Sequence, residues 1–441
     1  METQSPDPAS PAAPPALERA VPRWQVLALA VNSVVGSGIY LLPAAAAATL
    51  GAASVGAVPL AGLVVFLVVA CFAEAGSRFD QPGSAYLYTR EAFGEFPGFT
   101  VGWMAWLTRV ASVASLTVGL ADAVTFLLPS AGAGSVRTAM IVGPLVLLTV
   151  INVVGVRAGA GAAALLAIAK LVPLALFVAV GLFVASPATA LAQEPTRAGG
   201  LGATALLLLY AYAGFENTAA PAGEYRDPRR DVPFALFAHL ALVVVLYTAV
   251  QWVALGVLPG LAASTTPLAD AAAVFLGPWG LALLGVGGVV SILGTASDSV
   301  LSGPRYLLAL ARDGYGPRGV AAIHPRFHTP AMAIVVQAAI ALPLALTGSF
   351  VGLAALSVVA RLITYVGTAA AVPVLRRRQG RAPLTLPGGP TIPLAAIAVA
   401  LALATSAERS NLVAAGVALL VGAGVFALRR RDTKPSRGRA L

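Results

Sequence analysis

Two long apolar segments of this chain are interrupted by glycine near their middle, at Gly36-Ser37-Gly38 and at Ala213-Gly214-Phe215. A helix interrupted inside lipid leaves backbone N–H and C=O groups unpaired, which is tolerated only where these groups line a cavity or meet a partner. The two segments are the first and the sixth of twelve apolar segments along the chain. Interrupted helices at corresponding positions of two successive halves indicate a substrate site near the middle of the bilayer. The pattern is typical of membrane carriers.

The composition supports a membrane protein. Of the 441 residues 58% are hydrophobic and 10% are charged, whereas soluble domains contain roughly 45–50% apolar and about 25% charged residues. The net charge of +10 does not predict nucleic acid as a partner, because the basic residues lie in short loops instead of forming one face with interleaved aromatic residues.

We therefore expect an all-α polytopic membrane protein with twelve transmembrane helices, each containing about 20 apolar residues. The helices that contain the two interruptions, the first and the sixth, are expected to be discontinuous. The expected spans are 24–50, 54–75, 97–129, 136–155, 161–184, 202–222, 232–257, 279–310, 330–347, 351–375, 390–406 and 411–428.

The distribution of charge predicts the orientation and the ends of the chain. Most of the 28 basic residues lie in alternate loops, which places those loops and both termini in the cytoplasm. We therefore expect a multi-pass protein of the cytoplasmic (inner) membrane. Residues 1–20 are predicted to be a disordered cytoplasmic tail without a signal peptide. Residues 21–428 are expected to form a single transmembrane domain, and 429–441 a basic cytoplasmic tail that binds anionic membrane lipids.

A weak internal similarity divides the first ten spans into two halves, about 24–184 and about 202–375, followed by two extra helices at about 390–428. A short helix is predicted after the second span, at 88–94, and another after the seventh, at 271–275; each ends at Gly and Pro. Because each half has an odd number of spans, the two short helices are expected on opposite sides of the membrane, as an inverted repeat requires.

Two charged side chains lie deep inside apolar segments. Lys170, in the fifth span, must either lose its proton through desolvation or meet oxygen atoms that a cation would otherwise ligate; the alternative is that it extends to the membrane interface. Glu216 follows the second interruption, where it could carry a proton or accept hydrogen bonds from the exposed backbone N–H groups. The sequence leaves both pairs of alternatives open.

Four further charged residues lie within spans: Arg109, Asp122, Asp298 and Arg361. Unpaired charges in the membrane are costly, so we expect at least one ion pair among these four. The sequence does not indicate which residues pair, and Asp122 could instead face the outer vestibule.

The sequence lacks the residues that several other functional classes require. The single cysteine, Cys71, excludes an intrachain disulfide and a thiolate metal cluster, and the three histidines do not supply a metal site or a hydrolase triad. There is no nucleotide-binding motif. We therefore expect neither an enzyme nor a metal or cofactor.

Several motifs occur together in a specific order. They are Gly36-Ser37-Gly38-Ile39, residues 71–79 with 82–86, residues 214–217 with 227–233, residues 303–306 with 311–314, and residues 373–378. In this combination the chain resembles permeases of the amino acid-polyamine-organocation (APC) superfamily over nearly its whole length. The resemblance implies a LeuT-type fold, with five plus five inverted helices and two more. One departure is Gly83-Ser84, where the superfamily more often has two glycines.

The resemblance also implies how a substrate is held. Members bind the substrate carboxylate on backbone amides around Ser37 and Gly38, and the amino group on open carbonyls near Val34, Tyr210 and Ala213. Tyr210 stands where an aromatic lid is often found. Lys170 looks like the lysine that fills the sodium space in sodium-independent members, and Lys170 and Glu216 are the expected coupling residues. The expected substrate-binding residues are Val34, Gly36, Ser37, Gly38, Val113, Tyr210, Tyr212, Ala213, Gly214 and Phe215.

The substrate side chain is predicted from a few pocket positions. A gapless alignment of the third span brings Val113 to the pocket, and none of Val34, Tyr212 and Phe215 offers a charge to a cationic side chain. This favours a small, neutral and apolar amino acid over arginine or a polyamine.

The leading hypothesis is a secondary active amino acid transporter that works by alternating access, with protons as the coupling ion and without sodium. The alternatives are an amino acid exchanger and a non-transporting sensor of the same fold. A channel is disfavoured because no ring-forming filter sequence is present. The physiological amino acid and the oligomeric state are not specified by one chain.

Overall fold

The structure is a computed structural model, which describes residues 17–127, 134–196, 201–348, 350–405, 407 and 409–432. Within these ranges the chain is helical and forms no β-strand. The α-helices are α1 (Arg23–Val34), α2 (Ser37–Leu50), α3 (Ser54–Gly76), α4 (Ala85–Phe93), α5 (Glu95–Leu127), α6 (Gly134–Val154), α7 (Val156–Val184), α8 (Pro187–Leu191), α9 (Leu201–Tyr212), α10 (Pro228–Val257), α11 (Pro267–Leu310), α12 (Arg318–Ala321), α13 (Ala331–Thr347), α14 (Phe350–Gln379), α15 (Thr391–Ala404) and α16 (Arg409–Asp432).

Many of the helices are apolar and long enough for a membrane. Within the described residues, seven helical segments have the length and the hydropathy to cross a bilayer, and α13 and α15 are shorter apolar helices. The all-helical, polytopic fold is therefore confirmed. Helix occurs within each of the twelve expected spans, but the count of twelve and the inverted repeat stay predictions.

The first expected interruption is present. Helix α1 ends at Val34, residues Val35 and Gly36 are extended, and α2 begins at Ser37. Gly36 favours a break here, because glycine loses more conformational freedom in a helix than any other residue. Backbone groups are therefore open on both sides of this short gap.

The second interruption follows α9. The helix ends at Tyr212, Gly214 has φ +123°, and a short 3₁₀ turn, η3 (Phe215–Asn217), continues the chain. A Cβ at Gly214 would lie 2.4 Å from the carbonyl oxygen of Ser33 on α1. Glycine is thus required both for the backbone conformation and for the close contact between the two interrupted segments.

Both predicted short surface helices exist. Helix α4 ends at Gly94, which has φ +91°, and the first part of α11 ends at a kink at Gly277, which has φ +59°. The long helix α5 follows α4 and runs through the middle of the molecule, where it packs against α11 and α14 and is almost entirely buried.

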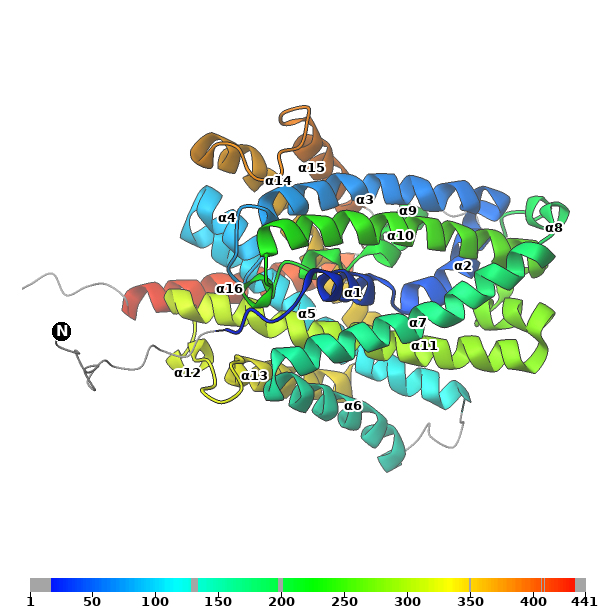
Figure 1. Cartoon of the computed structure of the whole chain (residues 1–441), viewed down its shortest axis with the longest axis horizontal. Coiled ribbons are helices and arrows are strands. Elements are labelled where there is room, and N and C mark those ends of the chain that lie inside the picture. Colours follow the sequence, from blue (N-terminus) through cyan, green and yellow to red (C-terminus); the bar gives the residue numbers. More distant parts are fainter. Residues whose placement is uncertain are drawn as a thin grey trace, which may run out of the picture.

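The end of the molecule that contains α4 and α12 in Figure 1 is crossed by ion pairs between distant segments. Arg305 of α11 binds Glu224 in the 3₁₀ turn η4 (Ala222–Glu224), and both side chains are fully buried. Arg376 of α14 binds Glu74 of α3 at 2.6 Å. These pairs tie together segments that lie far apart in the sequence.

The two chain ends are only partly described. Residues 1–16 and 433–441 lie outside the described residues, so the two expected tails stay predictions. The segment before α1 is hydrogen-bonded to the loop between α9 and α10. The N–H of Val21 donates to the carbonyl oxygen of Glu224 at 3.0 Å, and the N–H of Arg226 donates to the carbonyl oxygen of Val21 at 3.0 Å. Arg19 lies 3.5 Å from Asp80.

Candidate substrate cavity between the interrupted helices

A cavity lies between the two interruptions. Six helices contribute to its wall: α1 and α2 on either side of their gap, the end of α9, α5, α11 and α14. The empty space, including the part that is open to solvent, is about 520 Å³. The lining residues are Ser33, Val34, Gly36, Gly38, Arg109, Ser112, Ser115, Leu116, Ala211, Ala213, Gly214, Thr295, Ser299, Ser357 and Arg361.

The two interruptions contact each other through buried polar groups. Ser33 Oγ lies 2.7 Å from the carbonyl oxygen of Gly214 and 2.8 Å from Asp298 Oδ2. Asn217 Nδ2 donates to Ser33 Oγ at 3.1 Å and to Asp298 Oδ2 at 3.2 Å. Asp298 on α11 therefore joins both interrupted segments to the same helix.

Lys170 extends from α7 into the first interruption. Its Nζ donates to the carbonyl oxygens of Asn32 at 2.9 Å and Val35 at 2.6 Å, and lies 3.4 Å from Thr295 Oγ1. The side chain is fully buried. Lys170 therefore meets oxygen atoms inside the protein and does not extend to the membrane interface, the alternative that the sequence left open.

Glu216 lies between two arginines beside the second interruption. Its Oε1 is 3.3 Å from Arg109 of α5 and 3.2 Å from Arg361 of α14. Its Oε2 accepts from the backbone N–H of Gly214 at 3.0 Å and from the Tyr365 hydroxyl at 3.2 Å. Glu216 thus satisfies a backbone donor at the break, and it connects η3 to α5 and α14.

The expected pairing among the four intramembrane charges is wrong. Arg109 and Arg361 both bind Glu216, while Asp122 binds Arg137 at 2.8 Å. Asp298 accepts hydrogen bonds instead of forming an ion pair with either arginine. The reason is geometric. Folding brings Glu216 close to Arg109 and Arg361, and it brings Arg137 close to Asp122. The spacing of these residues in the sequence does not show which of them become neighbours.

Five of the ten expected substrate-binding residues line the cavity: Val34, Gly36, Gly38, Ala213 and Gly214. The side chains of Ser37 and Tyr210 lie outside the described residues, although the backbone of Ser37 begins α2.

Three expected residues lie elsewhere. Val113 does not line the cavity, because it is fully buried in an apolar cluster with Val110 and Ala114; Ser112 and Ser115 of the same helix face the cavity instead. Tyr212 faces the opposite side of α9 and donates to the carbonyl oxygen of Val58 at 3.0 Å.

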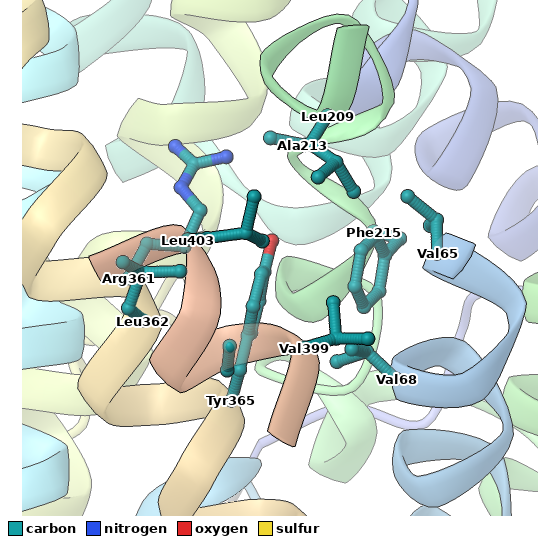
Figure 2. A pocket seen from close by; sticks show the side chains of 11 residues that line it. Val65, Val68, Leu209, Ala213, Phe215, Arg361, Leu362, Tyr365, Val399 and Leu403 are labelled. Carbon is teal, nitrogen blue, oxygen red and sulfur yellow. The ribbon is translucent and has the colours of Figure 1, made fainter. Parts of the chain in front are cut away.

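Phe215, the third of these residues, lines a separate apolar cavity between α3, α9, α14 and α15. Figure 2 shows the rings of Phe215 and Tyr365 facing each other in this cavity, with the Arg361 guanidinium group on the side away from Val65 and Val68. The two rings are stacked with their centroids 5.4 Å apart. Arg361 therefore contributes its aliphatic stem to the apolar cavity.

Tyr247 was missed by the sequence reasoning. Its hydroxyl on α10 lies 3.3 Å from both the carbonyl oxygen of Val34 and that of Ala211. These are carbonyls at the ends of the two interrupted helices, where open acceptors were expected. A tyrosine within the apolar run of α10 was the available signal, since a buried phenol hydroxyl needs a partner.

The described chain is helical and has several apolar spans. Its two interrupted helices contact each other and line one cavity. This combination is typical of membrane transport proteins. A sequence model described as amino acid permease matches residues 22–429. The chain therefore belongs to the amino acid permease family of the APC superfamily, as its motifs indicated.

The chain is similar to several transporters along most of its length. It is 30% identical over 430 residues to an uncharacterized transporter of Mycobacterium tuberculosis, covering 96% of this chain and 94% of the relative. It is 30% identical over 410 residues to the serine/threonine exchanger SteT of Bacillus subtilis (90% and 92%), and 25% identical over 438 residues to the branched-chain amino acid permease BcaP of the same species (94% and 94%). These relatives are transporters, so the expectation that the chain is not an enzyme is confirmed.

Proposed function

We propose that this protein is a secondary active transporter that carries a small amino acid across the cytoplasmic membrane by alternating access. The observation that carries the proposal is the contact between the two interrupted helices, which together line one cavity. The proposal includes twelve spans, two inverted repeats of five and both termini in the cytoplasm. The arginines at the end of the molecule with α4, among them Arg78 and Arg90, support a cytoplasmic position for that end, because cytoplasmic loops carry an excess of basic residues.

The substrate backbone would bind at the interruptions. The N-terminal end of α2, at Ser37 and Gly38, presents unpaired N–H groups and the positive end of the helix dipole, which suit a carboxylate. The ammonium group would bind at the carbonyl ends of α1 and α9. Tyr247 lies beside these helix ends, where its hydroxyl donates to the carbonyl oxygens of Val34 and Ala211.

Lys170 is proposed as the coupling residue. Its ammonium group occupies the gap between α1 and α2, where it donates to two carbonyl oxygens that a sodium ion would otherwise ligate. This supports transport without sodium and with protons as the coupling ion. Glu216 was expected to share this role, but its contacts with two arginines and Gly214 favour a structural role for its carboxylate.

The side chain of the substrate is proposed to be polar. The sequence favoured an apolar one, whereas serines, a threonine and two arginines line the cavity. Exchange of one amino acid for another is the second candidate mechanism, because the chain is similar to a protein named as a serine/threonine exchanger.

The proposal is tested by uptake of labelled serine, alanine, leucine, glutamate and arginine into proteoliposomes in sodium-free buffer, with and without an inward proton gradient. Gly36→Leu is the blocking variant, because a Cβ at Gly36 already lies 2.9 Å from Thr295 Oγ1. Uptake by the wild type that this variant loses would support the proposal. Binding without uptake would favour a sensor, and the absence of both would contradict an amino acid site.

A further inference from the structure

Four close contacts join Asp298 of α11 to the two interrupted segments. Ser33 Oγ lies 2.7 Å from the carbonyl oxygen of Gly214 and 2.8 Å from Asp298 Oδ2. Asn217 Nδ2 lies 3.1 Å from Ser33 Oγ and 3.2 Å from Asp298 Oδ2. All three side chains are buried. Each of these distances is that of a hydrogen bond, which requires one hydrogen between the two atoms.

The cluster does not supply enough hydrogens if Asp298 is ionised. The hydroxyl group of Ser33 has one hydrogen, the amide group of Asn217 has two, and an ionised carboxylate only accepts hydrogen bonds. The four contacts would therefore share three hydrogens. One of the two short oxygen–oxygen contacts of Ser33 would then have no hydrogen. The opposite orientation of the Asn217 amide group would enlarge this deficit, because it turns the amide oxygen toward the two acceptors.

A proton on Asp298 supplies the missing hydrogen. The carboxylic acid O–H donates to Ser33 Oγ, and the Ser33 hydroxyl is then free to donate to the carbonyl oxygen of Gly214. Asn217 still donates to Ser33 and to Asp298. Asp298 forms no ion pair with another described residue, since Arg109 binds Glu216 instead. An isolated buried carboxylate is costly, and such a group takes up a proton instead.

We infer that Asp298 binds and releases a proton during transport, and that this proton controls the hydrogen bond between the two interrupted segments. The inference rests on the proposed function and adds a proton-binding residue to it. When Asp298 gives its proton to water that enters the cavity, the Ser33 hydroxyl turns from Gly214 to the carboxylate, and the hydrogen bond between α1 and the second interruption is lost. When a proton returns, the bond forms again.

The position of Ser33 provides the path for this proton. Ser33 lines the cavity, whereas Asp298 lies behind it on α11. A hydroxyl group both accepts and donates, so Ser33 can pass a proton between cavity water and the carboxyl group. Lys170 binds the carbonyl oxygens of Asn32 and Val35, which flank the same turn of α1. Asp298 and Lys170 therefore both act on the first interruption.

The other titratable groups near Asp298 have partners of their own. Lys170 binds two backbone carbonyl oxygens, Arg109 binds Glu216, and two tyrosine hydroxyls donate to backbone carbonyl oxygens. The proton on Asp298 can therefore change while these bonds stay. The groups that face Asp298 lie on α5, α7, η3, α11 and the loop before α10, and they are Arg109, Lys170, Glu216, Tyr306 and Tyr225.

Infrared spectroscopy of the purified full-length protein tests the proton directly, because a protonated carboxyl group and a carboxylate absorb at different frequencies. At neutral pH the difference spectrum between the wild type and Asp298→Asn should contain a protonated-carboxyl band that shifts in heavy water. The band in the wild type should also decrease as the pH is raised. Asp122→Asn, at the half-exposed pair with Arg137, is the matched control and should keep the band. A difference spectrum without the band would overturn the inference.

Transport shows whether the proton is coupled to the amino acid. Proteoliposomes are supplied with labelled serine, alanine, leucine, glutamate or arginine in sodium-free buffer. An inward gradient of about one pH unit should raise accumulation by the wild type and Asp122→Asn by up to about tenfold for one coupled proton. It should not raise accumulation by Asp298→Asn, which should still exchange internal for external amino acid, with a rate independent of pH.

The outcomes separate this inference from the proposed function. An equal response of Asp298→Asn and the wild type to the gradient would contradict the role of Asp298 and leave the transporter standing. A wild type that neither takes up nor exchanges any of the five amino acids would contradict the proposed function. The infrared band tests the proton on Asp298 in either case, because it requires no substrate.

Discussion

Lys170 Nζ lies 2.6 Å from the carbonyl oxygen of Val35, in the gap between α1 and α2. A side chain of α7 thus completes the hydrogen bonding of an interrupted helix that belongs to the cavity wall. A movement of α1 and α2 away from α7 by more than the lysine side chain can follow would break this hydrogen bond and the one to the carbonyl oxygen of Asn32. The protonation state of Lys170 and the position of the first interruption are therefore linked.

Gly214→Ala should abolish most of the uptake. Alanine is strained at φ +123°, and its Cβ would lie 2.4 Å from the Ser33 carbonyl oxygen; strain of this kind costs on the order of 1–3 kcal/mol. The measurement is initial uptake rate per reconstituted protein. Gly416→Ala on α16 is the control, since a Cβ there meets no atom within 4 Å; equal rates in both variants would show that the contact between the interruptions is dispensable.

Glu216→Gln should lower the stability of the protein by about 3–5 kcal/mol, because it breaks the buried ion pairs of Glu216 with Arg109 and with Arg361. The midpoint of denaturant unfolding in mixed micelles measures this change. Asp122→Asn breaks the half-exposed pair with Arg137 and should cost only about 0–1 kcal/mol. An unfolding midpoint like that of the wild type in Glu216→Gln would contradict the structural role of this carboxylate.

The buried pair of Arg305 and Glu224 should behave as one unit. Each of the single variants Glu224→Gln and Arg305→Met leaves a buried polar or charged group unpaired and should destabilise the protein by about 3–5 kcal/mol. The double variant should cost clearly less than the sum, because the second change removes the group that the first left unpaired. The same denaturant midpoints provide the test, and additive effects would count against it.

A surface pair provides the reference for this cycle. Arg230 and Asp227 lie 3.8 Å apart and both side chains are largely exposed. The single variants Asp227→Asn and Arg230→Met should therefore each change the stability by only about 0–1 kcal/mol. The effect of the double variant should equal the sum of the two.

Local features of the sequence were sufficient for much of the fold. The glycines at 36 and 214 predicted both interruptions, because a glycine inside an apolar run acts on its own backbone. The depth of Lys170 in its span indicated either burial or extension to the membrane interface, and the structure shows burial. The Gly-Pro ends predicted the two short helices.

The details of the site depended on packing that the sequence does not encode locally. Successive helix residues differ by about 100° in direction, so an alignment without a structure placed Val113 in the cavity where Ser112 faces it. The partners of Glu216, and the contact of Tyr247 with two helix ends, join residues from helices far apart in the chain. Only the folded arrangement determines these distances.

The most direct test of a coupling role for Lys170 measures accumulation of the transported amino acid in proteoliposomes, with an inward proton gradient and in sodium-free buffer. The wild type is compared with Lys170→Ala. Arg318→Ala, at an exposed position, is the control. The account predicts that the wild type and the control accumulate substrate above the external concentration and that Lys170→Ala does not respond to the gradient. Accumulation by Lys170→Ala equal to that of the wild type would contradict a coupling role for the lysine in the first interruption.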